Sequence, residues 1–190
     1  MTSSVLFAPH SDDEALFASY IIMREKPLVV IMTDGTSHVE KFGISIEQRR
    51  NETIEGMKLL GVSVVFIGFA EESLDQRNSF KLLCERLGDY TYEFDRCFTP
   101  ALQGGHKHHD LVSKVCTQLW DLKCLYYSTY QKGSLEPVGE LEVKPTEVEK
   151  LMKEAVLEKY ASQIKINPHH FEAIKNKSEY LNLQPESWRA

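Results

Sequence analysis

Short strand-like segments alternate with amphipathic helical segments along most of the chain. Five segments predict strands: 5–8, 28–32, 62–66, 95–98 and 124–127. The run at 28–32 is unbroken and apolar, which is typical of a strand covered on both faces. This alternation predicts an α/β fold in which helices cover both faces of a mostly parallel sheet.

The connecting segments give weaker signals. Residues 36–43 and 71–75 are polar and predict loops, and we expect an edge strand to begin after Pro137. The last ten residues are polar and predict a poorly ordered end. Two capping-box patterns predict helix starts: Ser45-x-x-Gln48 and Thr146-x-x-Glu149.

The first candidate site lies where the first predicted strand ends. His10 is followed by three acids, Asp12, Asp13 and Glu14, and then by helical spacing through Met23. In an open α/β sheet, sites are built at this end of the strands. A spacing of three can aim His10 and Asp13 at one point, and their side chains are ordinary zinc ligands. Asp12 would then be free to act as a base on a water bound to the metal.

A second cluster follows the strand predicted at 95–98. His106, His108 and His109 lie within four residues, at the start of an amphipathic helix and directly after Gly104-Gly105. Because both clusters follow strands of a parallel sheet, we expect them to meet at one edge.

Each cluster also has a purely structural interpretation. Acids at a helix start cap the helix and complement its dipole, so Asp12 and Asp13 could serve only that purpose. The three histidines could likewise be helix-start residues without a ligand. Finding both clusters in one chain favours a metal site.

The two clusters resemble the motifs of a known family. Residues 9–14, Pro-His-Ser-Asp-Asp-Glu, resemble the A-H-P-D-D-E motif of the PIG-L/LmbE-like N-acetylglucosamine deacetylases. Residues 101–110, Ala-Leu-Gln-Gly-Gly-His-Lys-His-His-Asp, resemble their G-G-H-P-D-H-D segment. Two separated motifs in the right order make this resemblance specific. It implies a Rossmann-like, LmbE-like α/β fold and a zinc-dependent N-deacetylase that hydrolyses a linear amide.

The resemblance also implies roles for individual residues. Three are implied as zinc ligands: His10, Asp13 and His109. Asp12 is implied as the general base, and His106 as the group that stabilises the oxyanion of the tetrahedral intermediate. Arg49 is implied to position the substrate through sugar hydroxyls, a carboxylate or a phosphate. Without the resemblance, Arg49 would be interpreted as a solvated surface arginine.

The chain departs from the second motif at one important place. Lys107-His108 replaces Pro-Asp, and the missing aspartate would orient or polarise the neighbouring histidine. Asp110 could substitute for it, or His108 rather than His106 could enter the site. The replacement of a proline by Ser11 in the first motif is milder.

The expected reaction is hydrolysis of the N-acetyl group of an N-acetylglucosamine-type sugar or its conjugate. A water bound to zinc would attack the amide carbonyl while Asp12 takes its proton, and acetate and a free amino sugar would result. A zinc amidase acting on a different acyl amide and a catalytically lapsed sugar-binding protein remain as alternatives. Iron(II) could replace zinc, because two histidines and a carboxylate also suit non-haem iron.

Residues beyond the motifs are less informative. Tyr126, Tyr127 and Tyr130 could form a wall for a sugar ring, but we favour aromatic core and rim. His169 and His170 follow Asn167-Pro168, and for them a solvated helix start is favoured over the site.

Composition narrows the class of protein. A chain of 190 residues with 42% hydrophobic and 26% charged residues predicts one domain, spanning 1–190. The net charge of −6 and the lack of a basic block disfavour nucleic acid as a partner. The expected partner is a small amino-sugar substrate, and a homo-oligomer stays open.

The same analysis bears on where the protein works. Four cysteines without C-x-x-C spacing predict free, mostly buried thiols in a reducing compartment. A first strand directly at the start of the chain and the absence of a long apolar run predict no signal peptide and no membrane span. We therefore expect a cytoplasmic protein.

Overall fold

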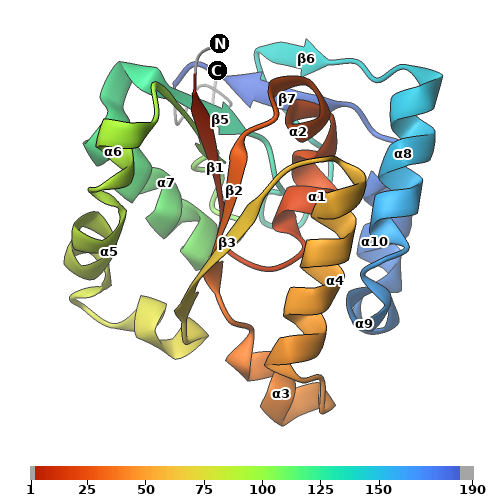
Figure 1. Ribbon diagram of the computed structural model, residues 1–190, viewed down its shortest axis with the longest axis horizontal. Helices are drawn as coiled ribbons and strands as arrows, with labels where there is room; N and C mark the ends of the chain where they lie inside the picture. Colours follow the sequence, from red (N-terminus) through yellow and green to blue (C-terminus); the bar gives the residue numbers. More distant parts are fainter. Residues whose placement is uncertain (1–2, 185–190) are drawn as a thin grey trace.

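The computed structural model describes residues 3–184, apart from the side chains of residues 37, 38 and 40. A seven-stranded sheet in the order β3-β2-β1-β4-β5-β7-β6 lies at its centre (Figure 1). Five of the strands are parallel: β1 (Ser4–Ala8), β2 (Leu28–Thr33), β3 (Val64–Phe69), β4 (Arg96–Pro100) and β5 (Cys124–Tyr127). The predicted α/β fold with a mostly parallel sheet is confirmed.

The last two strands run antiparallel to their neighbours. β6 (Leu141–Val143) confirms the edge strand expected after Pro137. β7 (Glu179–Asn182) lies between β5 and β6 and was not predicted. The expectation of a poorly ordered end is therefore wrong for residues 181 and 182, and residues 185–190 lie outside the described part of the chain.

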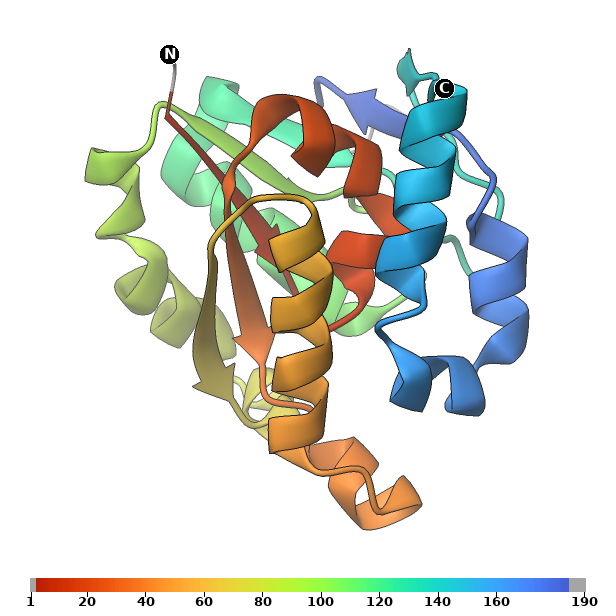
Figure 2. The same ribbon diagram turned by 45° about the vertical axis from the view of Figure 1, so that its right-hand side comes forward.

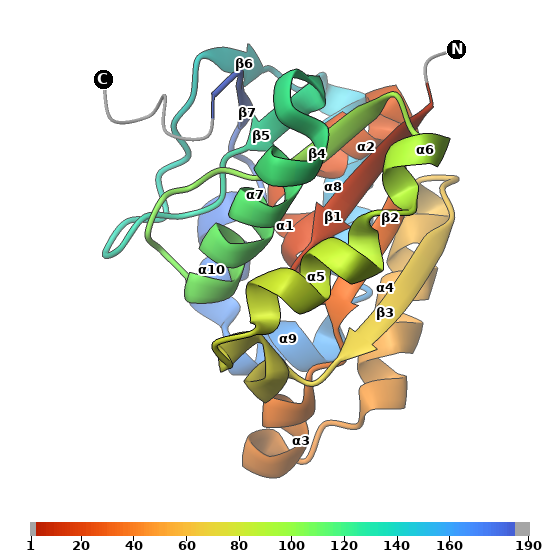
Figure 3. The same ribbon diagram turned by 90° about the vertical axis from the view of Figure 1, so that its left-hand side faces the viewer.

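Helices cover both faces of the sheet (Figures 1 and 3). One layer contains three helices: α5 (Ser79–Leu87), α6 (Tyr90–Glu93) and α7 (Lys107–Trp120). The other contains six: α1 (Asp13–Phe17), α2 (Ser19–Glu25), α4 (Ile46–Leu59), α8 (Glu147–Leu157), α9 (Ala161–Ile166) and α10 (Pro168–Ile174). Successive residues of β1 face opposite cores, because side chains alternate along a strand: Leu6 faces the second layer and Phe7 the first.

Two segments predicted as loops contain short helices. Residues 36–42 form α3 (Thr36–Phe42), which lies beyond the carboxyl ends of the parallel strands (Figure 2). Residues 71–75 form a 3₁₀ helix, η1 (Glu71–Asp75), and a second one, η2 (Asp121–Lys123), follows α7. Polar composition suggested irregular backbone, but short helices can also be polar when they lie at the surface.

The helix expected after the first motif is broken at Ala18 into α1 and α2. Ser19 contributes to the break because its hydroxyl donates to the Ala15 carbonyl at 2.6 Å. The break leaves helix ends inside the protein, and these ends need partners.

Two buried charges supply those partners. Glu179 of β7 accepts hydrogen bonds from the first N–H groups of α2, those of Tyr20 (2.9 Å) and Ile21 (3.1 Å). Lys153 of α8 donates to the Leu16 carbonyl of α1 at 2.8 Å and to Glu179 at 2.9 Å. The pair therefore ties β7 and α8 to the junction between α1 and α2.

Both predicted helix starts are confirmed. Ser45 Oγ accepts from the N–H of Gln48 at 3.0 Å at the start of α4. Thr146 and Glu149 form a reciprocal capping box at the start of α8. Arg24 also donates two hydrogen bonds to Glu149, at 2.8 and 2.9 Å, and these bonds with the Thr146 N–H lower the pKa of Glu149 to about 2.

The four cysteines are free, as predicted, and three of them are buried. Within residues 3–184, each helix is too short or too polar to cross a lipid bilayer.

Candidate metal centre and its cavity

Two loops at one edge of the sheet carry the candidate residues. Residues 9–12 connect β1 to α1, and residues 101–106 connect β4 to α7. β1 and β4 are adjacent and parallel, with Leu6 opposite Phe98, so their carboxyl ends lie side by side. The two motifs, about ninety residues apart in sequence, therefore meet as expected.

Four imidazole rings form one cluster at this edge. Neighbouring ring centres lie between 4.8 and 5.4 Å apart in the group His10, His106, His108 and His109. Imidazole nitrogens gathered this closely are a typical arrangement for binding a metal cation.

Two of the predicted ligands, His10 and His109, converge on an oxygen of the third, Asp13 Oδ2. His10 Nδ1 lies 3.0 Å from it and His109 Nε2 lies 3.1 Å from it. The backbone N–H of His10 also donates to this oxygen at 2.9 Å. The spacing of three residues thus folds the carboxylate of Asp13 back onto the loop that carries His10, and the three ligand atoms lie close enough to share one metal ion.

The ring of His109 is oriented by residues that the sequence did not indicate. Its Nδ1 lies 3.2 Å from the hydroxyl of Thr129, whose own proton is directed to Gln103 Oε1 at 3.2 Å. Gln103 also accepts from the N–H of Thr129 at 2.7 Å. His109 therefore donates from Nδ1, and its Nε2 lone pair faces Asp13.

This donor set fits a divalent metal. Nε2 of His109 is buried and has no hydrogen bond of good geometry among the described residues, although Asp13 is close. Burial alone would raise the pKa of Asp13, but His109 and His10 hold that pKa well below its usual value, so the carboxylate is ionised. Two neutral imidazoles and one carboxylate are the ligands of catalytic zinc sites and also of non-haem iron sites.

Asp12 lies beside these ligands in a strained backbone conformation. Its φ of 142° is one that residues with a Cβ rarely adopt. The strain is held by a hydrogen bond from the Asp12 N–H to Glu14 at 3.0 Å, and Glu14 in turn accepts from the Tyr160 hydroxyl. Burial raises the pKa of Asp12 well above its usual value, although Arg49 opposes the change.

The structure decides against the capping interpretation of Asp12. Within residues 3–184 its side chain makes no capping hydrogen bond to α1, and it lines a cavity instead. The interpretation holds in part for His106, which is the N-cap residue of α7.

Arg49 is buried, with 2% of its surface exposed, so its interpretation as a solvated surface arginine is wrong. It donates to the Ser11 carbonyl at 2.7 Å and lies 3.9 Å from both Asp12 and Glu71. Arg49 therefore braces the loop that carries Asp12 and also lines the cavity. Its predicted contact with substrate stays a prediction.

His106 is half-buried and lines the cavity. Its Nδ1 accepts from the backbone N–H of His108 at 3.2 Å, so a neutral ring carries its proton on Nε2. Burial, with help from the neighbouring His10, lowers the pKa of His106 to about 3 and keeps the ring neutral. Asp110, the candidate replacement for the missing aspartate, accepts instead from the N–H of Gly104 at 3.1 Å.

His108 enters the cluster as well. Its Nδ1 lies 3.0 Å from His10 Nε2, and its Nε2 lies 3.0 Å from Asp75 Oδ1. Lys107 contacts the other oxygen of Asp75 at 2.7 Å. Burial and His10 lower the pKa of His108, and the hydrogen bond with Asp75 opposes this. Asp75 was not predicted as a site residue, and the only sequence signal was the Lys107-His108 departure.

A cavity of about 230 Å³ opens over these groups. Beyond the predicted residues, its lining includes three polar side chains, Glu71, Asn167 and His170, and two aromatic ones, Phe17 and Tyr130. The ring of Tyr130 lies 5.3 Å from that of His109 and 6.0 Å from that of His170. Tyr126 and Tyr127 are buried in the core as expected.

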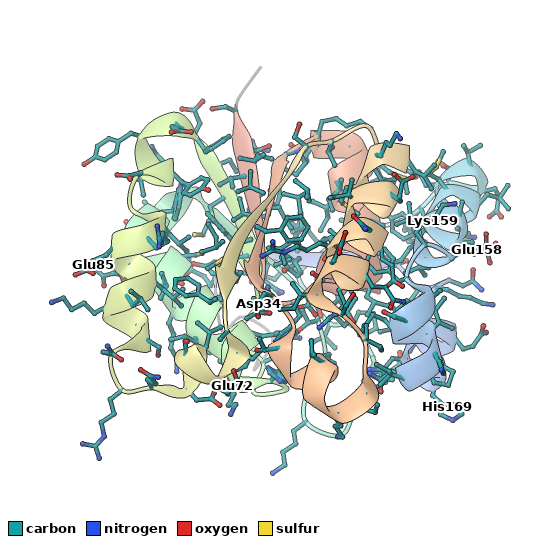
Figure 4. The ribbon with its side chains drawn as sticks, turned by 60° about the horizontal axis from the view of Figure 1, so that its bottom comes forward. Asp34, Glu72, Glu85, Glu158, Lys159 and His169 are labelled. Atoms are coloured by element: carbon teal, nitrogen blue, oxygen red, sulfur yellow. The ribbon has the colours of Figure 1, made fainter. Side chains whose placement is uncertain are left out.

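Helix α10 therefore contributes to the site, contrary to expectation for one of its histidines. His170 lines the cavity, whereas His169 points outward at the periphery of the molecule (Figure 4). The close approach of Tyr130 depends on Gly105, because a Cβ at that position would overlap the Tyr130 carbonyl oxygen.

Several solved structures share this fold. The conserved protein TT1542 from Thermus thermophilus matches with a TM-score of 0.71 and 21% identity, over 91% of this chain and 84% of that chain. The zinc-inhibited form of teicoplanin deacetylase Orf2 matches with a TM-score of 0.68 and 16% identity, over 87% and 86%. N,N'-diacetylchitobiose deacetylase from Pyrococcus horikoshii matches with a TM-score of 0.62 and 18% identity, over 84% and 70%. At these identities the likeness shows the fold alone.

A comparison with curated proteins gave no match. The model of the PIG-L family, described as GlcNAc-PI de-N-acetylase, matches residues 5–120. This range is more than half of the chain and contains both motifs, so the predicted resemblance is confirmed and the chain belongs to the PIG-L family.

Proposed function

We propose that this protein is a zinc-dependent hydrolase that removes the N-acetyl group from an N-acetylglucosamine-type amino sugar or its conjugate. The observation that carries the proposal is the convergence of His10, Asp13 and His109 beside a strained, half-buried Asp12. Membership of the PIG-L family and the deacetylases among the structural neighbours support the reaction class.

The metal would be held by His10, Asp13 and His109. When bound, it supplies a Lewis acid that lowers the pKa of a water molecule and polarises the amide carbonyl. Iron(II) is the second candidate for the same ligands.

Asp12 would act as the general base. An aspartate with an ordinary pKa of ~3.9 is a weak base near neutral pH, and the raised pKa of Asp12 brings it closer to the range in which a base is effective. Its strained backbone directs the carboxylate into the cavity rather than onto the start of α1. Asp12 would take the proton of the attacking water and later return it to the leaving amine.

His106 would stabilise the oxyanion that forms as the carbonyl is attacked. Because its Nδ1 accepts from the backbone of α7, its Nε2–H is available as a donor. A preorganised donor of this kind contributes typically about 3 kcal/mol to the transition state.

The cavity supports a small substrate group. Its volume of about 230 Å³ is below the ~300–1,000 Å³ typical of pockets for drug-sized ligands, so an acetamido group and part of one sugar ring would fill it. Tyr130, Asn167 and His170 are placed to contact that ring, and Arg49 stays a candidate for positioning it. The remainder of a larger conjugate would extend outside.

The test compares wild type with Asp13→Ala and Asp12→Asn. Zinc per chain would be measured by elemental analysis, and acetate release on a panel of N-acetylglucosamine derivatives. We expect about one zinc in wild type and in Asp12→Asn, little zinc in Asp13→Ala, and a rate in Asp12→Asn lower by about 10²- to 10⁴-fold.

The other outcomes separate the alternatives. Release of a different acyl group would indicate an amidase with other specificity, and sugar binding without acetate release would indicate a lapsed enzyme. A chain that binds no zinc, even when zinc is added back, would refute the proposed mechanism.

A further inference from the structure

We propose that His108 and Asp75 form a hydrogen-bonded pair that positions the metal ligand His10 and strengthens it as a ligand. This inference rests on the metal site proposed above. It assigns a function to the Lys107-His108 departure, which the proposed reaction leaves unexplained.

The first argument is the order of donors and acceptors. His10 directs its Nδ1 towards the ligand group of Asp13 and His109, so the proton of its neutral ring is on Nε2. That nitrogen lies 3.0 Å from His108 Nδ1, which must then accept, so His108 carries its own proton on Nε2. Nε2 of His108 lies 3.0 Å from Asp75 Oδ1, an acceptor. The two hydrogen bonds are therefore consistent: His10 Nε2 donates to His108 Nδ1, and His108 Nε2 donates to Asp75 Oδ1.

The second argument is that both residues of the departure contact the same carboxylate. Lys107 contacts Asp75 Oδ2 at 2.7 Å, while His108 contacts Asp75 Oδ1. Asp75 ends η1, a segment outside both motifs. The exposed Lys107 tethers Asp75, and the buried His108 connects Asp75 to the metal ligand.

The third argument is a comparison with the other histidine ligand. His109 donates its Nδ1 proton to the Thr129 hydroxyl, which in turn donates to Gln103 Oε1. Metal-binding histidines usually donate their second N–H to an acceptor in this way, which fixes the ring and makes the ligand more basic. The pair of His108 and Asp75 gives His10 the equivalent partner.

The same rings could be interpreted as a second metal site, because ligand atoms of His10, His106 and His108 also lie close together. Protonation argues against it. His106 uses its Nδ1 lone pair as the cap of α7, which leaves a proton on Nε2, and His10 would need to bind metal through both nitrogens at once. We therefore assign His108 as a positioning residue rather than a ligand.

The experiment measures zinc affinity and stoichiometry by titrating metal-free protein in competition with a chromophoric chelator. The variants are His108→Leu, His108→Gln, Asp75→Ala, the double variant Asp75→Ala/His108→Leu, and Lys107→Met. We expect His108→Leu and Asp75→Ala each to weaken zinc binding by about 10- to 100-fold. Circular dichroism of the metal-free variants checks that they fold.

Three comparisons distinguish positioning from general damage. His108→Gln should bind zinc more tightly than His108→Leu, because its amide oxygen can still accept from His10. In the His108→Leu background, Asp75→Ala should weaken zinc binding by less than about threefold more, because Asp75 acts through His108. Lys107→Met should change affinity less than Asp75→Ala, because Lys107 lies outside the chain of rings.

Several results would overturn the inference. One is equal affinity in wild type and His108→Leu; another is an undiminished effect of Asp75→Ala when His108 is already leucine. Two zinc ions in wild type and one in His108→Leu would make His108 a ligand. Failure of the deacetylase proposal would look different. Wild type would bind one zinc and Asp13→Ala would not, but wild type would release no acetate.

Discussion

The buried pair of Lys153 and Glu179 allows a quantitative prediction about the fold that supports the site. The side chains are 0% and 2% exposed, and together they satisfy the inner ends of α1 and α2. Glu179→Gln would leave the ammonium of Lys153 buried without a counter-charge. Removing one partner of a buried pair costs about 3–5 kcal/mol, and we expect a value near 3 because the amide oxygen can still accept one N–H of α2.

Lys153→Met removes the opposite charge. The carboxylate of Glu179 keeps the N–H groups of Tyr20 and Ile21, so the cost should be at or below that of Glu179→Gln. The double variant holds no unpaired charge and should lose less than the sum of the two single losses, by about 1–3 kcal/mol. A single loss near 3 kcal/mol is a large fraction of a typical domain stability of about 5–15 kcal/mol.

The assay is urea unfolding followed by circular dichroism. Its control is the exposed pair of Lys81 and Glu85 on α5, with side chains 81% and 63% exposed, where neutralising either charge should cost below about 0.5 kcal/mol. The reasoning would be refuted if Glu179→Gln cost no more than the control, or if the two single effects in the buried pair were additive.

Two further predictions concern the second ring nitrogen of a ligand and the α8 cap. Thr129→Val should weaken zinc binding by about tenfold in the chelator competition, because His109 loses the acceptor for its Nδ1 proton; unchanged affinity would contradict this. For Glu149, the folded-state pKa of about 2 lies below the ordinary 4.5, so its ionised form stabilises the fold above pH 4.5 and this contribution is lost as the pH falls towards 2. Glu149→Gln should therefore lower the free energy of unfolding by about 1 kcal/mol at pH 7, a modest value because Arg24 is exposed. The loss should be smaller at pH 3. An equal loss in urea unfolding at both pH values would show that the ion pair of Arg24 and Glu149 is not the source of the stabilisation.

Much of the fold followed from the local pattern. The parallel strands are continuous apolar runs because both faces of the sheet are covered, and this leaves a clear signal in the sequence. The signal failed for β7, where Glu179 and Asn182 are buried by contacts with distant segments rather than by their own hydrophobicity. It failed again at Ala18, where a break that looks unfavourable locally is stabilised by Lys153.

The meeting of the two predicted clusters also followed from the sequence by itself. His10 and Asp13 lie three residues apart in one loop, and the carboxyl ends of adjacent parallel strands bring His109 to the same point. Local spacing and one rule of sheet topology predict that the two clusters meet, whereas the choice of His109 among the three histidines came from the family resemblance.

Only the tertiary structure decided how those residues are oriented. Thr129 selects the nitrogen that His109 presents, the backbone of α7 selects the nitrogen that His106 presents, and Asp75 meets His108 from a separate turn. The bonds of Thr129 and Asp75 join segments that are far apart in sequence, whereas the bond at His106 is a local helix cap. The orientation of His108 and His109 therefore depends on packing between distant segments, and no local sequence pattern predicts that packing.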